Sequence, residues 1–349
     1  MHFSFIKLIH ALFFAFLSLS MHTHLQASIK TKVIITAGAD KLTRQHVGQI
    51  LSRTISKANS MREGGNSLQS LKGICTASGY KKLQSLLLNT RFYATRPEYR
   101  LPLLVGLNQA WEVRGLKVFI RNEVSDTTFT QYLVFSITHD LKLSDIRFAL
   151  ESHHYRSIFS KGQTVEDSDN RMEIVRYLED FRTAHNNKNI AYIEQQYSNL
   201  ALIIVGRVIQ TDSSSMSYLN AVDPNGRGIE SESASAQNMV NNELGDQQIE
   251  FIRLSKQEYI RRLRAAFIRN ETVHIIFQDV TIKRHPMHAA IYGIHVRQYW
   301  ESTTYSDAGY LFIMIDFSDK EKPVIHVRAW QRTKFADGST VGLGDFYIN

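Results

Sequence analysis

The sequence predicts an α+β protein of two domains, in each of which helices pack on an antiparallel sheet. The chain has 349 residues, about twice the ~150 residues typical of one domain. Hydrophobic residues make up 43% of it and aromatic residues 11%, a composition that excludes disordered, collagen-like and coiled-coil chains. Helical periodicity precedes strand periodicity in the first half, and the same order restarts in the second half.

Residues 1–27 have the three parts of a secretory signal peptide. Lys7 supplies the positive charge, residues 8–19 form the apolar core, and Leu25-Gln26-Ala27 precedes the expected cleavage site. A membrane anchor is the alternative, but the apolar run is shorter than the ~20 residues that span a bilayer. The single cysteine, Cys75, lies far from the cleavage site, so no lipid anchor is expected there. We therefore expect an exported protein, periplasmic or extracellular, that is not a lipoprotein and has no integral membrane segment.

Cysteine content and charge bear on the core and on the partners. A lone cysteine cannot close an intramolecular disulfide, so Cys75 is expected to be a small buried hydrophobic residue, with a nucleophile or an intermolecular bridge as alternatives. The formal net charge is +8, yet the chain has no run of four lysines and arginines. We interpret the excess charge as solvated surface and expect no nucleic-acid partner.

The first domain is expected over residues 28–160, with helices before strands. A helix over about 40–59 places apolar side chains on one face, and a second helix over about 80–88 follows a Gly/Asn/Ser-rich turn. Runs rich in Val, Ile, Phe, Tyr and Leu then predict an antiparallel meander. Its strands are expected at 101–106, 111–121, 129–139 and 143–151.

The second domain is expected over residues 161–349 and begins with a polar stretch. Helices are predicted at 169–184 and around Tyr192, followed by a strand at 200–209. Residues 210–247 are rich in Ser, Asn and Asp, so we expect them to form a polar surface excursion.

A capping box marks the start of the next helix, because Ser255 is followed three residues later by Glu258. Alternating and apolar runs after this helix predict four strands. These strands are expected at 272–283, 289–301, 309–318 and 323–332.

Five strings of the second half resemble those of a known group of proteins. They lie at 177–184, 284–294, 305–310, 316–317 and 325–331, and the closing residues 345–348 fit as well. They look like strings of tandem nuclear transport factor 2-like (SnoaL-like) exported proteins of unknown function from Bacteroidota, and residues 111–116 resemble that group's more divergent first domain. The resemblance implies two cone-shaped (cystatin-like) domains, 28–160 and 161–349, in which a bent sheet wraps a long helix and leaves a pocket.

Enzymes with this type of fold use a buried carboxylate or histidine that faces a second polar group. The polar candidates on the predicted strands are Asp279, His295, Asp316, His326 and Arg328. None of them belongs to a motif of such an enzyme. His285 and His288 have a metal-like spacing, but Lys283 and Arg284 beside them would repel a cation. The chain lacks a phosphate-binding loop, a nucleophile elbow and a dinucleotide fingerprint. We therefore expect no metal and no cofactor, and the catalytic residues, if any, stay unknown.

Six residues of the second domain are the candidates for a ligand site, namely Trp300, Tyr305, Asp307, His326, Arg328 and Trp330. Strand alternation places His326, Arg328 and Trp330 on one face, so that an imidazole, a cation and a ring converge. The other three are expected at the pocket entrance, near a turn. Such a set suits an anionic or polar aromatic ligand better than a hydrocarbon. If that face is convex, the residues are solvent-exposed instead.

The sequence favours an exported, non-catalytic module that binds a small ligand or an envelope protein. An enzyme of the isomerase, hydratase or hydrolase kind is the first alternative, and a structural assembly protein is the second. A buried carboxylate with a raised pKa that faces a polar group would favour the enzyme. An apolar open groove would favour the binding module, and a large exposed sheet face would favour assembly. Whether the chain forms an oligomer stays open.

Overall fold

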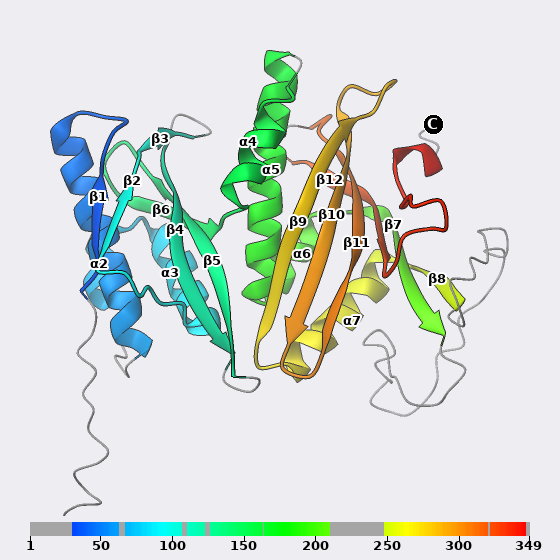
Figure 1. The fold of residues 1–349 in the computed structure, drawn as a ribbon, viewed down its shortest axis with the longest axis horizontal. Coiled ribbons are helices and arrows are strands. Elements are labelled where there is room, and N and C mark those ends of the chain that lie inside the picture. Colours follow the sequence, from blue (N-terminus) through cyan, green and yellow to red (C-terminus); the bar gives the residue numbers. More distant parts are fainter. Residues whose placement is uncertain are drawn as a thin grey trace, which may run out of the picture.

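The protein is described by a computed structural model that covers residues 30–62, 67–106, 110–122, 126–162, 164–209, 248–319 and 322–346. The predicted signal peptide (1–27) and the polar excursion (210–247) lie outside the described residues. Within these ranges the chain is α+β, as predicted, and a long central helix lies between two sheets (Figure 1). None of the described helices is both long and apolar enough to cross a membrane.

The first half contains a four-stranded antiparallel sheet with helices on one face. The order along the chain is β1 (Lys32–Ile35), α2 (Lys41–Arg62), η1 (Gln69–Ile74), α3 (Ala77–Thr90), β2 (Glu98–Leu101), β3 (Leu104–Val105), β4 (Trp111–Asn122), β5 (Thr127–Ile137) and β6 (Leu143–Phe148). Strands β3, β4, β5 and β6 form the predicted meander, while β1 and β2 form a separate parallel pair that the sequence did not predict.

Local sequence explains why α3 begins and packs where it does. The Thr76 hydroxyl accepts a hydrogen bond from the Gly79 amide at 3.0 Å, which satisfies one of the free donors of the first turn. Gly79 also lies so close to the Leu143 carbonyl of β6 that a Cβ there would clash. The helix can therefore lie directly on the sheet, where Leu83 and Leu87 join the first hydrophobic core.

The second half contains a six-stranded mixed sheet. The order along the chain is α4 (Ser152–Phe159), α5 (Val165–Asn186), α6 (Ile190–Gln195), β7 (Tyr197–Ile209), β8 (Gln248–Leu254), α7 (Lys256–Arg269), β9 (Val273–Arg284), β10 (Ile291–Ser302), β11 (Ser306–Asp316), β12 (Val324–Gln331) and η4 (Leu343–Asp345). The strand order is β8-β7-β12-β11-β10-β9, with β7 and β12 parallel and the other neighbours antiparallel. The sheet is open, with β8 and β9 at its edges.

Helix α7 starts where the capping box predicts, since the Ser255 hydroxyl accepts a hydrogen bond from the Glu258 amide at 3.1 Å. Strand β8, directly before it, was not predicted.

The two faces of the six-stranded sheet are covered differently. The inner face packs on α5, α6 and α7 through residues such as Phe181, Phe267 and Ile313, each of them buried. The outer face packs against the C-terminal segment 332–346, where the rings of Phe312 and Phe346 stack at 5.7 Å. Both faces of the sheet are therefore covered, the inner one by helices and the outer one by the C-terminal segment. A cavity can lie only at the margins of these contacts.

Helix α5 joins the two halves, because its opposite sides contact different sheets (Figure 1). Towards the first sheet its Glu179 carboxylate is fully buried and binds Arg147 at 3.0 Å. Arg147 also reaches Glu112 at 2.5 Å and Asp145 at 3.0 Å, so one buried guanidinium is shared by three carboxylates. Burial alone would raise the pKa of Glu112, but the charges of Arg147 and Arg114 outweigh it and lower the pKa.

Candidate ligand-binding pocket

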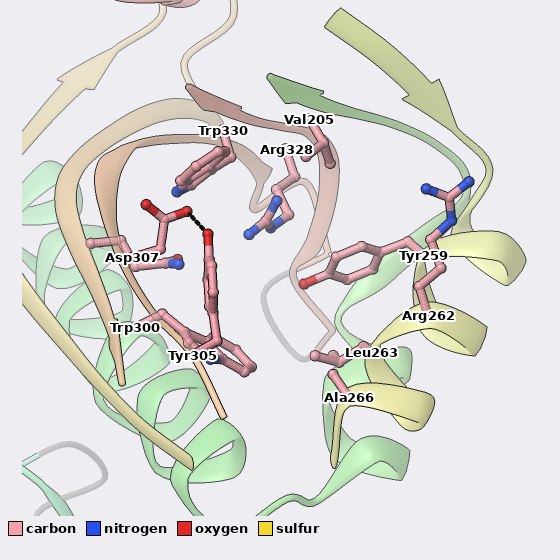
Figure 2. Close-up of a pocket in the computed structure, with 11 residues that line it drawn as sticks. Val205, Tyr259, Arg262, Leu263, Ala266, Trp300, Tyr305, Asp307, Arg328 and Trp330 are labelled. Carbon is pink, nitrogen blue, oxygen red and sulfur yellow. Dashed lines mark hydrogen bonds between the residues drawn. The ribbon is translucent and has the colours of Figure 1, made fainter. Parts of the chain in front are cut away.

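A pocket of about 110 Å³ opens between α7 and the inner face of the six-stranded sheet (Figure 2). Its walls come from β7, α7, β10, β11 and β12 and from the turn between β10 and β11. The lining residues are Val205, Tyr259, Arg262, Leu263, Ala266, Gln298, Trp300, Tyr305, Asp307, Arg328 and Trp330. The site is thus built where the amphipathic helix α7 faces the strands that end the chain's second half.

Aromatic rings form much of the wall. Trp300 stacks on Phe267 of α7, with 6.4 Å between ring centroids and 9° between planes, which fixes the indole in place. Trp330 lies against β11 at Gly309, where a Cβ would come within 2.8 Å of the indole. Glycine at this position therefore leaves room for the indole against the strand.

Arg328 is the charged residue of this wall that lacks a charged partner. Arg328 is only 7% exposed, and its Nε has no hydrogen-bond partner. Within the described ranges its guanidinium makes no ion pair, and its recorded contact is a cation–π interaction with Tyr259, 5.0 Å from the ring centroid. Buried cations are normally paired with an anion, so the pocket holds an unsatisfied positive charge.

Asp307 lies in the same pocket but is engaged elsewhere. The Tyr305 hydroxyl donates to its Oδ2 at 2.6 Å, the Ala308 amide donates to its Oδ1 at 2.8 Å, and Arg332 Nε lies 4.0 Å from Oδ1. Burial raises the pKa of Asp307 above its usual value, and the hydrogen bond from Tyr305 only partly opposes this shift. A carboxylate thus stands at the pocket without neutralising Arg328.

The remaining titratable neighbours leave the charge of Arg328 uncompensated. Arg262, at the rim, is paired with Glu258 at 2.6 Å. His185 lies behind Trp300, with ring centroids 6.5 Å apart, and burial lowers its pKa to about 3, so it is neutral at pH 7. The Trp300 Nε1 is a further buried donor without a partner. Both unsatisfied groups are donors, which suits a ligand that accepts hydrogen bonds.

The structure brings five of the six candidate residues together at this pocket: Trp300, Tyr305, Asp307, Arg328 and Trp330. His326 lies outside the lining. The register of β12 shifts between Ile325 and Val327, which makes His326 the extra residue of a bulge. Its Nε2 lies 3.3 Å from Asp316 Oδ2 instead. The prediction that His326 shares a face with Arg328 and Trp330 is therefore wrong, because strict alternation fails at a bulge.

Several lining residues were not singled out in the sequence. Tyr259, Leu263 and Ala266 lie at helical spacing on the apolar face of α7, and that face contributes to the core. The same face extends beyond the core to the pocket. The spacing of Tyr259, Leu263 and Ala266 was the signal in the sequence for this wall of the pocket. It could not show that the wall lies near Arg328, because that proximity depends on the strand order of the sheet.

The other candidates lie apart from this pocket. Asp279 occupies a left-handed conformation, with φ of 50°, at a bulge of β9, and lines an outer groove together with His295. Cys75 is free and buried, as predicted, and burial raises the pKa of its thiol to about 11, which argues against a nucleophile. Across the described ranges no three His, Cys, Asp or Glu residues gather as a metal site would require.

Comparisons with known proteins add little to this description. No family model matches the chain, and no curated protein matches it. A structure of Bdellovibrio bacteriovorus Bd1075 is similar at 11% identity, with a TM-score of 0.31, over 66% of this chain and 92% of the other. A structure of naphthalene 1,2-dioxygenase with indole bound in its active site is similar at 7% identity, with a TM-score of 0.33, over 53% and 89%. These scores are too low to assign the chain to either protein's family.

Proposed function

We propose that the second half of the chain is a non-catalytic binding module that holds a small anionic ligand in the pocket of Figure 2. The observation that carries this proposal is Arg328, a 7% exposed arginine without an anionic partner in the described chain. An unpaired buried charge costs several kcal/mol, and a bound anion would remove that cost. The buried charge destabilises the empty pocket, and a bound anion would stabilise it.

The lining fits a ligand with an apolar body. Leu263, Ala266 and Val205 line the pocket together with the rings of Trp300 and Trp330. Ligand sites typically combine such apolar walls with a few polar groups that fix orientation. Here the polar groups are Arg328 at one side and the Tyr305–Asp307 pair at the other.

The scaffold is proposed to be nuclear transport factor 2-like in the second half, with a more divergent copy in the first. The support is the order of elements, two helices, a strand, a helix and four strands, with β8 as an additional edge strand. The proposal that the protein is exported rests on the sequence of residues 1–27.

An enzyme remains the second candidate, because Asp307 combines a raised pKa with a hydrogen bond from Tyr305. Enzymes use buried carboxyl groups with a raised pKa to accept or release a proton. The assembly role has less support, since the C-terminal segment covers part of the outer sheet face through Val341, Leu343 and Phe346.

The proposed binding is tested by thermal unfolding of the full chain with acetate, benzoate, phosphate and sulfate. At least one anion is expected to raise the melting temperature saturably, by roughly 5–11 °C at 100 times its Kd. Arg328→Met should lose this shift, whereas Arg264→Met, which removes an exposed arginine of α7, should keep it. Equal shifts in wild type and Arg328→Met, or none with any anion, would contradict the proposal.

A further inference from the structure

We infer that the ligand of this pocket is a small aromatic monocarboxylate, bound with its carboxylate on Arg328 and its ring between the aromatic walls. This inference rests on the proposed function and adds the chemical class of the ligand. It follows from the charge, the donor geometry and the size of the site.

The charge of the site matches a single negative charge. Arg262 is already paired with Glu258 at 2.6 Å, so Arg328 is the cation of the described lining that an incoming anion can neutralise. Asp307 adds a negative charge on the other side of Tyr305, and its oxygens accept from Tyr305 and Ala308. A dianion such as phosphate would keep one charge uncompensated and would be repelled by Asp307.

The donors favour a carboxylate over other monoanions. A guanidinium presents its N–H groups in a planar fork that matches the two oxygens of a carboxylate. Tyr259 lies over the guanidinium with its ring centroid 5.0 Å from the central carbon, and Figure 2 shows the terminal nitrogens directed into the space between Tyr305 and Tyr259. The N–H groups of Arg328 are therefore presented to the pocket.

The walls favour a flat ring as the body of the ligand. Tryptophan and tyrosine rings contact another aromatic ring either stacked or edge-on. Both arrangements stabilise a bound aromatic ring more than an aliphatic ring of equal area. The volume of about 110 Å³ is below the ~150 Å³ of a cavity that takes up benzene, so a single bound ring would extend into the pocket mouth. Larger fused ring systems exceed this space.

Isothermal titration of the full chain with matched probes tests the class. Benzoate is expected to bind, benzamide to bind about 10- to 150-fold more weakly because it lacks the charge, and cyclohexanecarboxylate about 2- to 10-fold more weakly because it lacks the ring. Arg328→Met should weaken benzoate about 10- to 150-fold but leave benzamide almost unchanged. Arg328→Lys, which keeps the charge without the fork, should fall between wild type and Arg328→Met, and Arg264→Met should match wild type.

The outcomes separate this inference from the proposed function. Arg328-dependent binding of phosphate or cyclohexanecarboxylate that equals or exceeds that of benzoate would overturn the aromatic monocarboxylate and keep the anion site. Binding of benzoate that Arg328→Met and Arg328→Lys leave unchanged, with both variants folded by circular dichroism, would overturn the inference and the proposed site. Binding of no anion would overturn both as well.

Discussion

Two buried arginines of this chain are expected to respond in opposite ways to the same substitution. Arg147 is 2% exposed and binds Glu112, Asp145 and Glu179, whereas Arg328 is 7% exposed and binds no anion in the described chain. Replacement by methionine keeps most of the side-chain stem and removes the charge. Replacing an arginine that stabilises the fold should destabilise the chain, whereas replacing an arginine that serves a ligand should not.

The magnitudes follow from the partners of each side chain. Arg147→Met takes away one of the two cations that each of these three buried carboxylates binds, since Arg114 still binds Glu112 and Glu179 and Lys82 still binds Asp145, so the free energy of unfolding should fall by up to about 3–5 kcal/mol. Arg328→Met removes an unpaired buried charge and loses a cation–π contact at 5.0 Å that is worth about 0.5–2 kcal/mol. Because the relieved desolvation exceeds this loss, the free energy of unfolding should rise by about 1–3 kcal/mol.

Urea unfolding of the full chain at pH 7.5, followed by far-ultraviolet circular dichroism, measures both changes. Arg100→Met is a matched control, since Arg100 is exposed and its pair with Glu98 should contribute at most about 1 kcal/mol. A loss of stability in Arg328→Met comparable to that in Arg147→Met would refute the reasoning, because it would mean that Arg328 has a structural partner.

Two further predictions concern carboxylates. Asp307→Asn should tighten benzoate binding about 3- to 10-fold at pH 7.5, since it removes a negative charge from the pocket, and calorimetry should find the wild-type affinity rising as the pH falls and Asp307 takes up its proton, while that of the variant stays level. Burial, reinforced by the charge of Asp145, raises the pKa of Asp180 to about 6 from 3.8. Ionisation of Asp180 therefore opposes folding above about pH 6 and not below pH 3.8. Asp180→Asn should raise the free energy of unfolding in urea by about 1–3 kcal/mol at pH 7.5. A gain that does not shrink towards pH 4 would contradict this assignment.

The sequence predicted the elements of the fold better than their pairing. Helix α7 was located by its capping box, because Ser255 and Glu258 interact within one turn and need no distant partner. Strand β8 was missed, since it adjoins a polar stretch and pairs with β7 across residues 210–247. The parallel pair of β1 and β2 was missed for the same reason, because its two members are far apart in the sequence.

The candidate site was predictable where local rules hold. Tyr305 and Asp307 were found because they lie at a turn, and Arg328 and Trp330 because they are two residues apart on one strand. His326 departs from alternation because the bulge depends on how β12 pairs with β7 and β11. The network of Arg147 and Glu179 was not foreseen either, since its members approach only when α5 lies against the first sheet.

The most direct test of the proposed site is a crystal structure of the protein isolated from its native source. We predict a small molecule in the pocket of α7 and β12, with two acceptor oxygens about 2.7–2.9 Å from the guanidinium nitrogens of Arg328. A protein carboxylate paired with Arg328, or a side chain filling the space between Trp300 and Trp330, would contradict the claim that this pocket exists to bind an anion.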